Sequence, residues 1–195
     1  MHRYGYFERF DERTARVYRF VEVALGWAYS FTANLIKKMV NAPARVLEIG
    51  PGTGVLANRL SGLGYHVIGV DVSMAMLKRG HGRFWRPDFI NGGSWALPVI
   101  DDSFDVAVTV FTLHHWGDHE SSMINVVRVL KPGGVFIVVE ADGDLFGRVT
   151  NHSCTTKCLS DSARYFSSVT IRRRFPLMIA IAKEPRKELA KPFLR

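Results

Sequence analysis

A glycine-rich loop at residues 50–54 constrains the fold of this 195-residue chain more than any other feature. The loop follows a short apolar run at 45–49 and precedes a segment with helical spacing. A strand that enters a glycine turn and then a helix aims backbone N–H groups at a bound ligand. Glycine is needed where such a turn takes a positive φ or approaches a ligand closely. Because an ordinary tight turn would have the same residues, the loop alone is weak support for nucleotide binding.

Apolar segments alternate with helical segments beyond the loop. We expect buried strands at 45–49, 66–70, 88–90, 104–111 and 135–140. Helices are expected between them at 55–60, 73–80 and 120–130. Strands that are apolar throughout and alternate with helices form a parallel sheet covered on both faces. Right-handed crossovers then make the fold a doubly wound α/β sheet.

The two ends of the chain follow different patterns. Near the C-terminus we expect strands at 168–174 and 177–183, which form an antiparallel pair at the end of a mostly parallel seven-stranded, Rossmann-like sheet. Residues 6–40 have helical spacing, with Gly26 as a break. The sequence thus predicts a single domain over 1–195, with an N-terminal helical cover (1–41), a cofactor-binding core (42–140) and a C-terminal strand pair and tail (141–195).

Aromatic side chains are frequent in the N-terminal helices. They suit a cover over a flat or apolar ligand, although packing between helices explains them equally well: Tyr4, Tyr6, Phe7, Phe10, Tyr18 and Phe20. We therefore expect these helices to lie over the site.

Asp71 strengthens the interpretation of the loop. It ends the second expected strand about twenty residues beyond the loop, where an acidic side chain accepts hydrogen bonds from ribose hydroxyls. The loop has the spacing G-x-G-x-G, and Val55 stands where a dinucleotide fingerprint has its third glycine. Glu48, just before the loop, suits a ligand with an ammonium group better than one with phosphates. These residues favour adenosine binding without a pyrophosphate.

Taken together, the motifs of the central region resemble a known family. The chain is similar to class I S-adenosylmethionine-dependent methyltransferases, of the small-molecule subgroup that includes the ubiquinone/menaquinone-biosynthesis and phospholipid methyltransferases. The resemblance covers about residues 45 to 140, and it rests on segments 46–54, 67–73, 76–77, 97–98, 102–106, 113–116 and 128–134.

The resemblance implies S-adenosylmethionine as the cofactor and a set of contacts to it. Gly50, Gly52, Gly54 and the loop backbone would lie along its methionine part, and Glu48 would hold its amino group through water. Asp71 would bind the ribose hydroxyls. The adenine would lie against Val72 and Met76, and Phe111 would lie beside the methyl-bearing sulfur.

One position departs from the family pattern. An acidic residue is usual four positions before the leucine of the Leu97-Pro98 pair, but this chain has Gly93 there. The backbone of Ser94 and Trp95 is expected to serve in its place, with the Trp95 ring available for stacking on the adenine.

A cluster of histidines follows the fourth expected strand. In doubly wound sheets ligands bind at the carboxyl ends of the strands, so this cluster is expected at the mouth of the site. We expect His115 to contact the substrate or act as a general base, with His114 as the second candidate. Three histidines also suggest a metal, but no carboxylate or cysteine has matching spacing, so no metal is expected.

The methyl acceptor is the least determined part of the prediction. A small-molecule or lipid-like acceptor is the first hypothesis. A net charge of +8 and a basic, aromatic segment at 78–86 favour RNA as an alternative, and Arg172, Arg173 and Arg174 add to it. A non-catalytic adenosine-binding module and a nicotinamide oxidoreductase stay open as further alternatives.

The cysteines and the apolar runs bear on the compartment. Cys154 and Cys158 are the only cysteines and are expected to be ordinary thiols in a reducing compartment. We find no signal-peptide pattern and no apolar run near the roughly 20 residues that a membrane span needs. The sequence therefore predicts a cytoplasmic protein, and it leaves the oligomeric state open.

Overall fold

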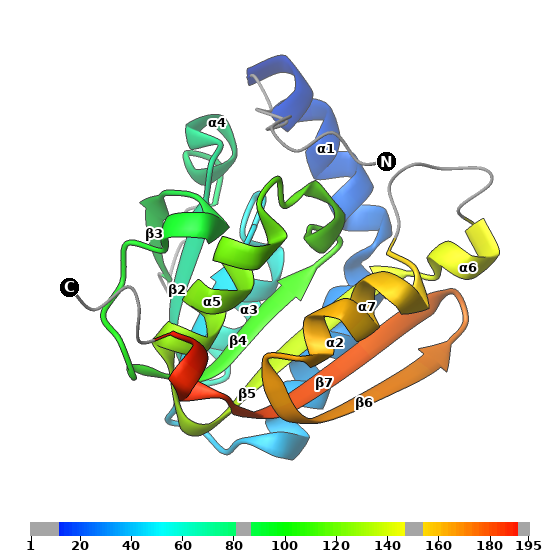
Figure 1. The fold of residues 1–195 in the computed structure, drawn as a ribbon. Helices are drawn as coiled ribbons and strands as arrows, with labels where there is room; N and C mark the ends of the chain where they lie inside the picture. The colour runs from blue at the N-terminus through cyan, green and yellow to red at the C-terminus, as the bar shows by residue number, and fades with distance from the viewer. Residues whose placement is uncertain (1–11, 81–86, 147–153, 191–195) are drawn as a thin grey trace.

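The computed structural model describes residues 12–80, 87–146 and 154–190. In this part of the chain a single seven-stranded sheet has the strand order β3-β2-β1-β4-β5-β7-β6 (Figure 1). The strands are β1 (Arg45–Ile49), β2 (His66–Asp71), β3 (Asp88–Asn91), β4 (Phe104–Val110), β5 (Leu130–Ala141), β6 (Phe166–Arg174) and β7 (Leu177–Pro185).

Helices flank the sheet and connect its strands. They are α1 (Glu12–Ala24), α2 (Gly26–Met39), α3 (Val55–Gly62), α4 (Met74–Leu77), α5 (His119–Val129), α6 (Gly143–Phe146) and α7 (Thr156–Ala163). Three short 3₁₀ turns complete the described elements: η1 (Ser94–Ala96), η2 (Leu113–His115) and η3 (Lys187–Leu189).

The sheet has the topology that the sequence predicts. Strands β1 to β5 pair in parallel, and β7 pairs antiparallel with both β5 and β6. The chain moves outward from β1 through β2 to β3, then returns to the other side of β1 with β4. Such a reversal opens a crevice at the carboxyl ends of the two central strands, where ligands of α/β sheets bind. The doubly wound α/β prediction is confirmed.

Apolar side chains are buried on both faces of the sheet. Along β4, Val106 and Val108 face a core formed with α2 and α3, whereas Ala107 belongs to the core under α5 and α7. Figure 1 shows α5 and α7 on the near side of the sheet and α2 and α3 behind it. Each fully buried leucine or phenylalanine stabilises the fold by about 1.5–3 kcal/mol. This double burial explains why the central strands are mostly apolar rather than alternating between apolar and polar residues.

The N-terminal region forms two helices that meet at Leu25. The predicted break at Gly26 is therefore confirmed. Helix α2 buries Ala28, Tyr29 and Ile36 against the sheet, whereas α1 extends past the carboxyl end of β4 (Figure 1). Of the aromatic residues expected in the cover, Tyr4, Tyr6, Phe7 and Phe10 lie outside the described residues.

Several element boundaries differ from the prediction, most of them by one or two residues. Strand β5 begins at Leu130 rather than Val135, because residues 131–134 continue the strand through a register shift against β4 instead of forming a separate turn. Helix α4 ends at Leu77, three residues earlier than expected. The last strand is longer than the predicted 177–183, since β7 runs to Pro185.

Cys154 and Cys158 form a disulfide, so the prediction of ordinary thiols is wrong. Cys154 lies just before α7 and Cys158 lies in its first turn, which brings their Cα atoms to 5.8 Å. That separation is within the usual range for a disulfide. A four-residue spacing reads equally well as two unlinked thiols, and the sequence alone does not choose between them.

Within the described ranges, none of the helices combines the length and the apolar character that crossing a membrane requires.

Candidate functional site

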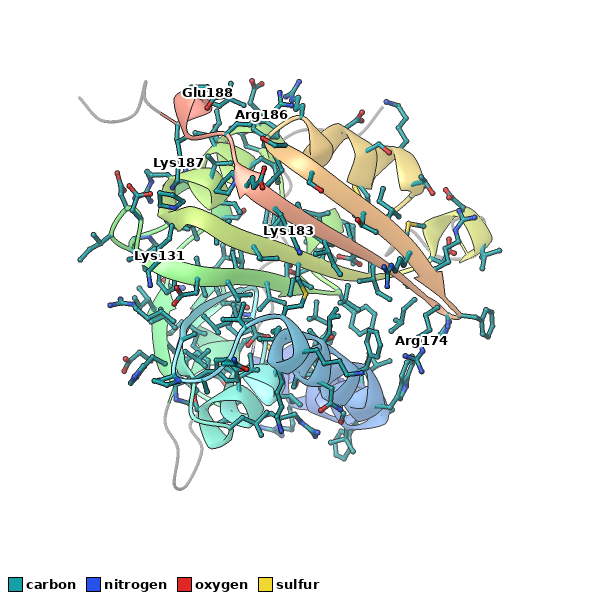
Figure 2. All side chains as sticks on the ribbon, turned by 90° about the horizontal axis from the view of Figure 1, so that it is seen from below. Lys131, Arg174, Lys183, Arg186, Lys187 and Glu188 are labelled. Atoms are coloured by element: carbon teal, nitrogen blue, oxygen red, sulfur yellow. A yellow bond between two sulfur atoms is a disulfide. The ribbon has the colours of Figure 1, made fainter. Side chains whose placement is uncertain are left out.

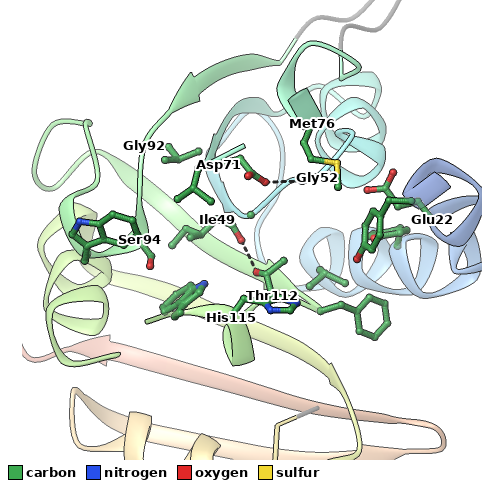
Figure 3. Close-up of a pocket in the computed structure, with 18 residues that line it drawn as sticks. Glu22, Ile49, Gly52, Asp71, Met76, Gly92, Ser94, Thr112 and His115 are labelled. Atoms are coloured by element: carbon green, nitrogen blue, oxygen red, sulfur yellow. Dashed lines mark hydrogen bonds between the residues drawn. The ribbon is translucent and has the colours of Figure 1, made fainter. Parts of the chain in front are cut away.

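A cavity opens at the carboxyl ends of β1, β2 and β4, at the reversal of the strand order. It holds about 780 Å³, counted out to its open mouth. The described residues that line it are Tyr18, Glu22, Tyr29, Ile49, Gly50, Gly52, Val70, Asp71, Val72, Met76, Gly92, Ser94, Trp95, Val110, Phe111, Thr112, His115 and Trp116 (Figure 3).

The glycine loop forms the floor of this cavity. Gly50, Gly52 and Gly54 all have positive φ, at 74°, 56° and 77°. A Cβ atom on Gly50 would lie 2.7 Å from the side chain of Thr112, so the loop has no room for a larger residue there. Gly50 and Gly52 line the cavity, whereas Gly54 precedes α3 and lies against Phe89. Gly50 and Gly52 therefore leave bare backbone at the cavity surface.

Asp71 lies across from the loop at the end of β2. Its Oδ2 accepts a hydrogen bond from the Gly52 backbone N–H at 3.2 Å (Figure 3). Its Oδ1 accepts one from the Ser73 N–H at 2.8 Å. Burial raises its pKa to about 6, against the lowering effect of these two hydrogen bonds. Asp71 is thus anchored to the loop while it lines the cavity.

Glu48 does not line the cavity. Its carboxylate is fully buried behind the loop and accepts a hydrogen bond from the backbone N–H of Ala57 in α3. Within the described part of the chain, its Oε2 atom has no hydrogen-bond partner. Burial, followed by the nearby charge of Glu22, raises the pKa of Glu48 well above its usual range. Direct contact between Glu48 and a ligand in the cavity does not fit this position.

The cavity wall beside β3 explains why position 93 is a glycine rather than the acidic residue of the family pattern. A Cβ atom on Gly93 would lie 2.3 Å from the Trp95 ring, so the indole occupies the space that a side chain at 93 would need. Ser94 and Trp95 line the cavity, as do Val72 and Met76 on the neighbouring wall. An aromatic ring therefore stands where the family pattern has a carboxylate.

Phe111 stands at the end of β4 with an unusual backbone. Its φ is 57°, in the left-handed region, which costs a residue other than glycine on the order of 1 kcal/mol. The ring lines the cavity and meets Tyr29 edge to face at 6.3 Å. The adjacent Thr112 donates its hydroxyl to the Ile49 carbonyl at 3.0 Å, which ties β4 to β1 below the loop.

The two candidate histidines have different surroundings. His115 lines the cavity, whereas His114 does not. His114 Nδ1 lies 3.0 Å from Oε2 of the buried Glu140, and the two histidine rings are 3.9 Å apart. Only His115 of the pair is therefore placed for direct contact with a ligand, and His114 stands behind it.

The sequence predicts Tyr18 in the helical cover over the site, and Tyr18 does line the cavity. Sequence reasoning missed two further lining residues from these helices, Glu22 and Tyr29. Phe20, also expected in the cover, is 75% exposed instead. Glu22 offered a usable signal, because it is a single charged residue in the apolar run 21–25, and a charge in such a run needs a specific partner.

Residues 47–138, just under half of the chain, match the model of the family described as "Methyltransferase domain". This region of the chain is therefore similar to a methyltransferase domain. The match covers the loop, Asp71 and the histidines, which are the parts that surround the cavity. Methyltransferase relatives agree with this assignment.

Two curated relatives show the extent of the similarity. The chain is 37% identical over 103 residues to a demethylmenaquinone methyltransferase of Renibacterium salmoninarum, covering 53% of this chain and 44% of that protein. It is 35% identical over 124 residues to a ubiquinone/menaquinone biosynthesis C-methyltransferase of Hahella chejuensis, covering 59% and 48%. The chain thus spans less than half the length of these relatives.

Solved structures support the fold over most of the chain. A methyltransferase structure from Thermotoga maritima, described as a possible histamine N-methyltransferase, has a TM-score of 0.69 at 24% identity and covers 89% of this chain and 96% of that one. A putative S-adenosylmethionine-dependent methyltransferase from Methanococcus maripaludis has a TM-score of 0.70 at 15% identity, covering 93% and 96%. At these identities the similarity establishes the fold.

Proposed function

We propose that this chain transfers a methyl group from S-adenosylmethionine to a small-molecule acceptor. The observation that carries the proposal is the shared cavity of Gly50, Gly52, Asp71 and Phe111 at the reversal of the strand order. Glycines at positive φ leave a cradle that any Cβ atom would fill, which fits a ligand lying close against the loop.

The lining residues divide into groups that suit the parts of the cofactor. Asp71 would accept hydrogen bonds from the ribose hydroxyls. The adenine would lie between Met76 and Trp95, with Val72 and Ser94 beside them. Gly50 and Gly52 would support the methionine part, and Phe111 would border the methyl-bearing sulfur. The anchoring of Asp71 by Gly52 and Ser73 supports this assignment, since it fixes the carboxylate before the ligand binds.

The acceptor side of the cavity is mostly aromatic. Tyr18, Tyr29, Phe111, His115 and Trp116 surround it, which suits a flat and largely apolar acceptor. The names of the curated relatives, methyltransferases of demethylmenaquinone and ubiquinone/menaquinone biosynthesis, point in the same direction. We therefore propose an acceptor of this lipid-like, quinone-precursor class.

The cofactor supplies an electrophilic methyl group on a sulfonium, which an acceptor atom displaces in line. The protein's part is to hold the two reactants in line and to exclude water. His115 is placed to take a proton from an acceptor that must lose one. His114, held by Glu140 and in contact with the His115 ring, would act as a positioning residue for it.

RNA is a weaker candidate acceptor. Lys183 on β7 pairs in register with Val135 of β5, and Lys131 lies at the amino end of β5 (Figure 2). The cavity lies at the carboxyl ends of the parallel strands instead. Arg173 is engaged by Asp142 and Asp144. Lys131, Arg173 and Lys183 do not line the cavity, and segment 81–86 lies outside the described residues.

A turnover screen tests the proposed activity. The chain would be incubated with S-adenosylmethionine carrying a labelled methyl group and with quinone precursors, phospholipids, amines or RNA. We expect label in the quinone-precursor arm, and loss of that label in the His115→Ala variant if the acceptor must be deprotonated. Transfer to RNA alone would contradict the proposed acceptor class.

A further inference from the structure

The glycine loop has a second carboxylate above it, which comes from the N-terminal helix α1. Glu22 is 1% exposed and lines the cavity (Figure 3). Its Oε1 accepts a hydrogen bond from the Thr53 backbone N–H at 3.0 Å, and its Oε2 accepts one from the Thr53 hydroxyl. A Cβ atom on Gly52 would lie 2.5 Å from the same Oε1. The carboxylate therefore lies directly against the loop.

This arrangement changes what the loop can bind. Glycine loops before a helix commonly hold anions with their backbone N–H groups. Here the Thr53 N–H is engaged by Glu22 and the Gly52 N–H by Asp71. Both donors already serve protein carboxylates, which disfavours a phosphate or a second carboxylate at this end of the loop.

The charge of the cavity also disfavours an anionic ligand group. Although the chain has a net charge of +8, the described lining contains Glu22 and Asp71 and no lysine or arginine. Burial, and then the charge of Glu22, raises the pKa of Tyr18 to about 12, which keeps this lining phenol neutral. A cavity walled by carboxylates at low dielectric favours a cationic group.

We propose that Glu22 binds the ammonium group of the methyl donor's methionine part, so that α1 is a wall of the donor site. This inference rests on the proposed function. Glu22 then takes the role that the sequence suggested for Glu48, which lies behind the loop and does not line the cavity. The donor's own carboxylate is directed away from Thr53, because Glu22 occupies that N–H.

The experiment measures binding rather than turnover. Calorimetry compares S-adenosylhomocysteine with its deamino analogue, which lacks only the ammonium group, for the wild-type chain and for Glu22→Gln. The glutamine keeps the size of the side chain and an acceptor for Thr53. Loss of a charge-assisted hydrogen bond should weaken the affinity of Glu22→Gln for S-adenosylhomocysteine by roughly 10- to 100-fold relative to the wild type. Its affinity for the deamino analogue should stay within about twofold of the wild-type value. Glu12→Gln, a change to an exposed carboxylate on the same helix, is the matched control and should alter neither affinity.

The outcomes separate the possible failures. Equal affinity of Glu22→Gln and wild type for S-adenosylhomocysteine would overturn the inference. Equal weakening of both ligands would also overturn it, because Glu22 would then only hold the loop in shape. If the wild type itself binds neither ligand nor S-adenosylmethionine, the proposed function fails as well. Thermal unfolding of each variant shows whether a loss of affinity comes from a loss of fold.

Discussion

The Asp71 carboxylate is held in place by hydrogen bonds, but its burial disfavours the ionised form. Two backbone N–H groups hold the carboxylate, yet burial still raises its pKa to about 6. An ionised carboxylate is needed to accept hydrogen bonds from two ribose hydroxyls. With this raised pKa, Asp71 takes up a proton just below neutral pH, so the effect of its protonation on ligand binding can be measured.

This pKa predicts a pH dependence of donor binding. As the pH falls through about 6, Asp71 takes up a proton and its affinity for the ribose is lost, by up to about tenfold for each further pH unit. Above that pH the affinity should be level. Dissociation constants for S-adenosylhomocysteine from pH 5 to pH 8 check this. Asp71→Asn should bind weakly and show no slope, and a wild-type affinity that does not change over this range would refute the role of Asp71.

At the scale of elements, the segment around η1 shows how neighbouring structure replaces a family feature. Helix α5 holds this segment through Asn125, whose amide donates to the Trp95 carbonyl at 2.7 Å and whose oxygen accepts from the Leu97 N–H at 3.2 Å. Ser94 and Ser122 share a further hydrogen bond at 2.8 Å. With the backbone held in this way, the Trp95 ring lies over Gly93 and excludes any side chain from that position.

Restoring the acidic residue should therefore damage this wall. Gly93→Asp would bring a Cβ atom to 2.3 Å from the Trp95 ring, and forcing the ring aside should cost about 1–3 kcal/mol of the free energy of unfolding. Urea denaturation measures the loss. Gly26→Ala is the control, because a Cβ atom there meets no other atom within 4 Å. A Gly93→Asp variant as stable as the wild type would show that Trp95 moves without cost.

At the scale of the whole molecule, the sheet could be predicted and parts of the site could not. Apolar strands that alternate with helices are local patterns, so the parallel core and the positions of Gly50 and Asp71 followed from the sequence. Glu22 reaches the loop only through the path of α1, and it is 31 residues from its partner Thr53. The Trp95 ring over Gly93 and the Cys154–Cys158 disulfide join residues only two and four positions apart, but these spacings fit other side-chain arrangements equally well.

The central claim concerns the whole cavity, which should accept a cationic adenosine ligand and reject a dinucleotide. Titration calorimetry of the wild-type chain with S-adenosylmethionine, and separately with NAD, tests this most directly. The account predicts saturable binding of S-adenosylmethionine at one site and no binding of NAD, because carboxylates engage the loop N–H groups that a pyrophosphate would need. Binding of NAD without binding of S-adenosylmethionine would contradict it.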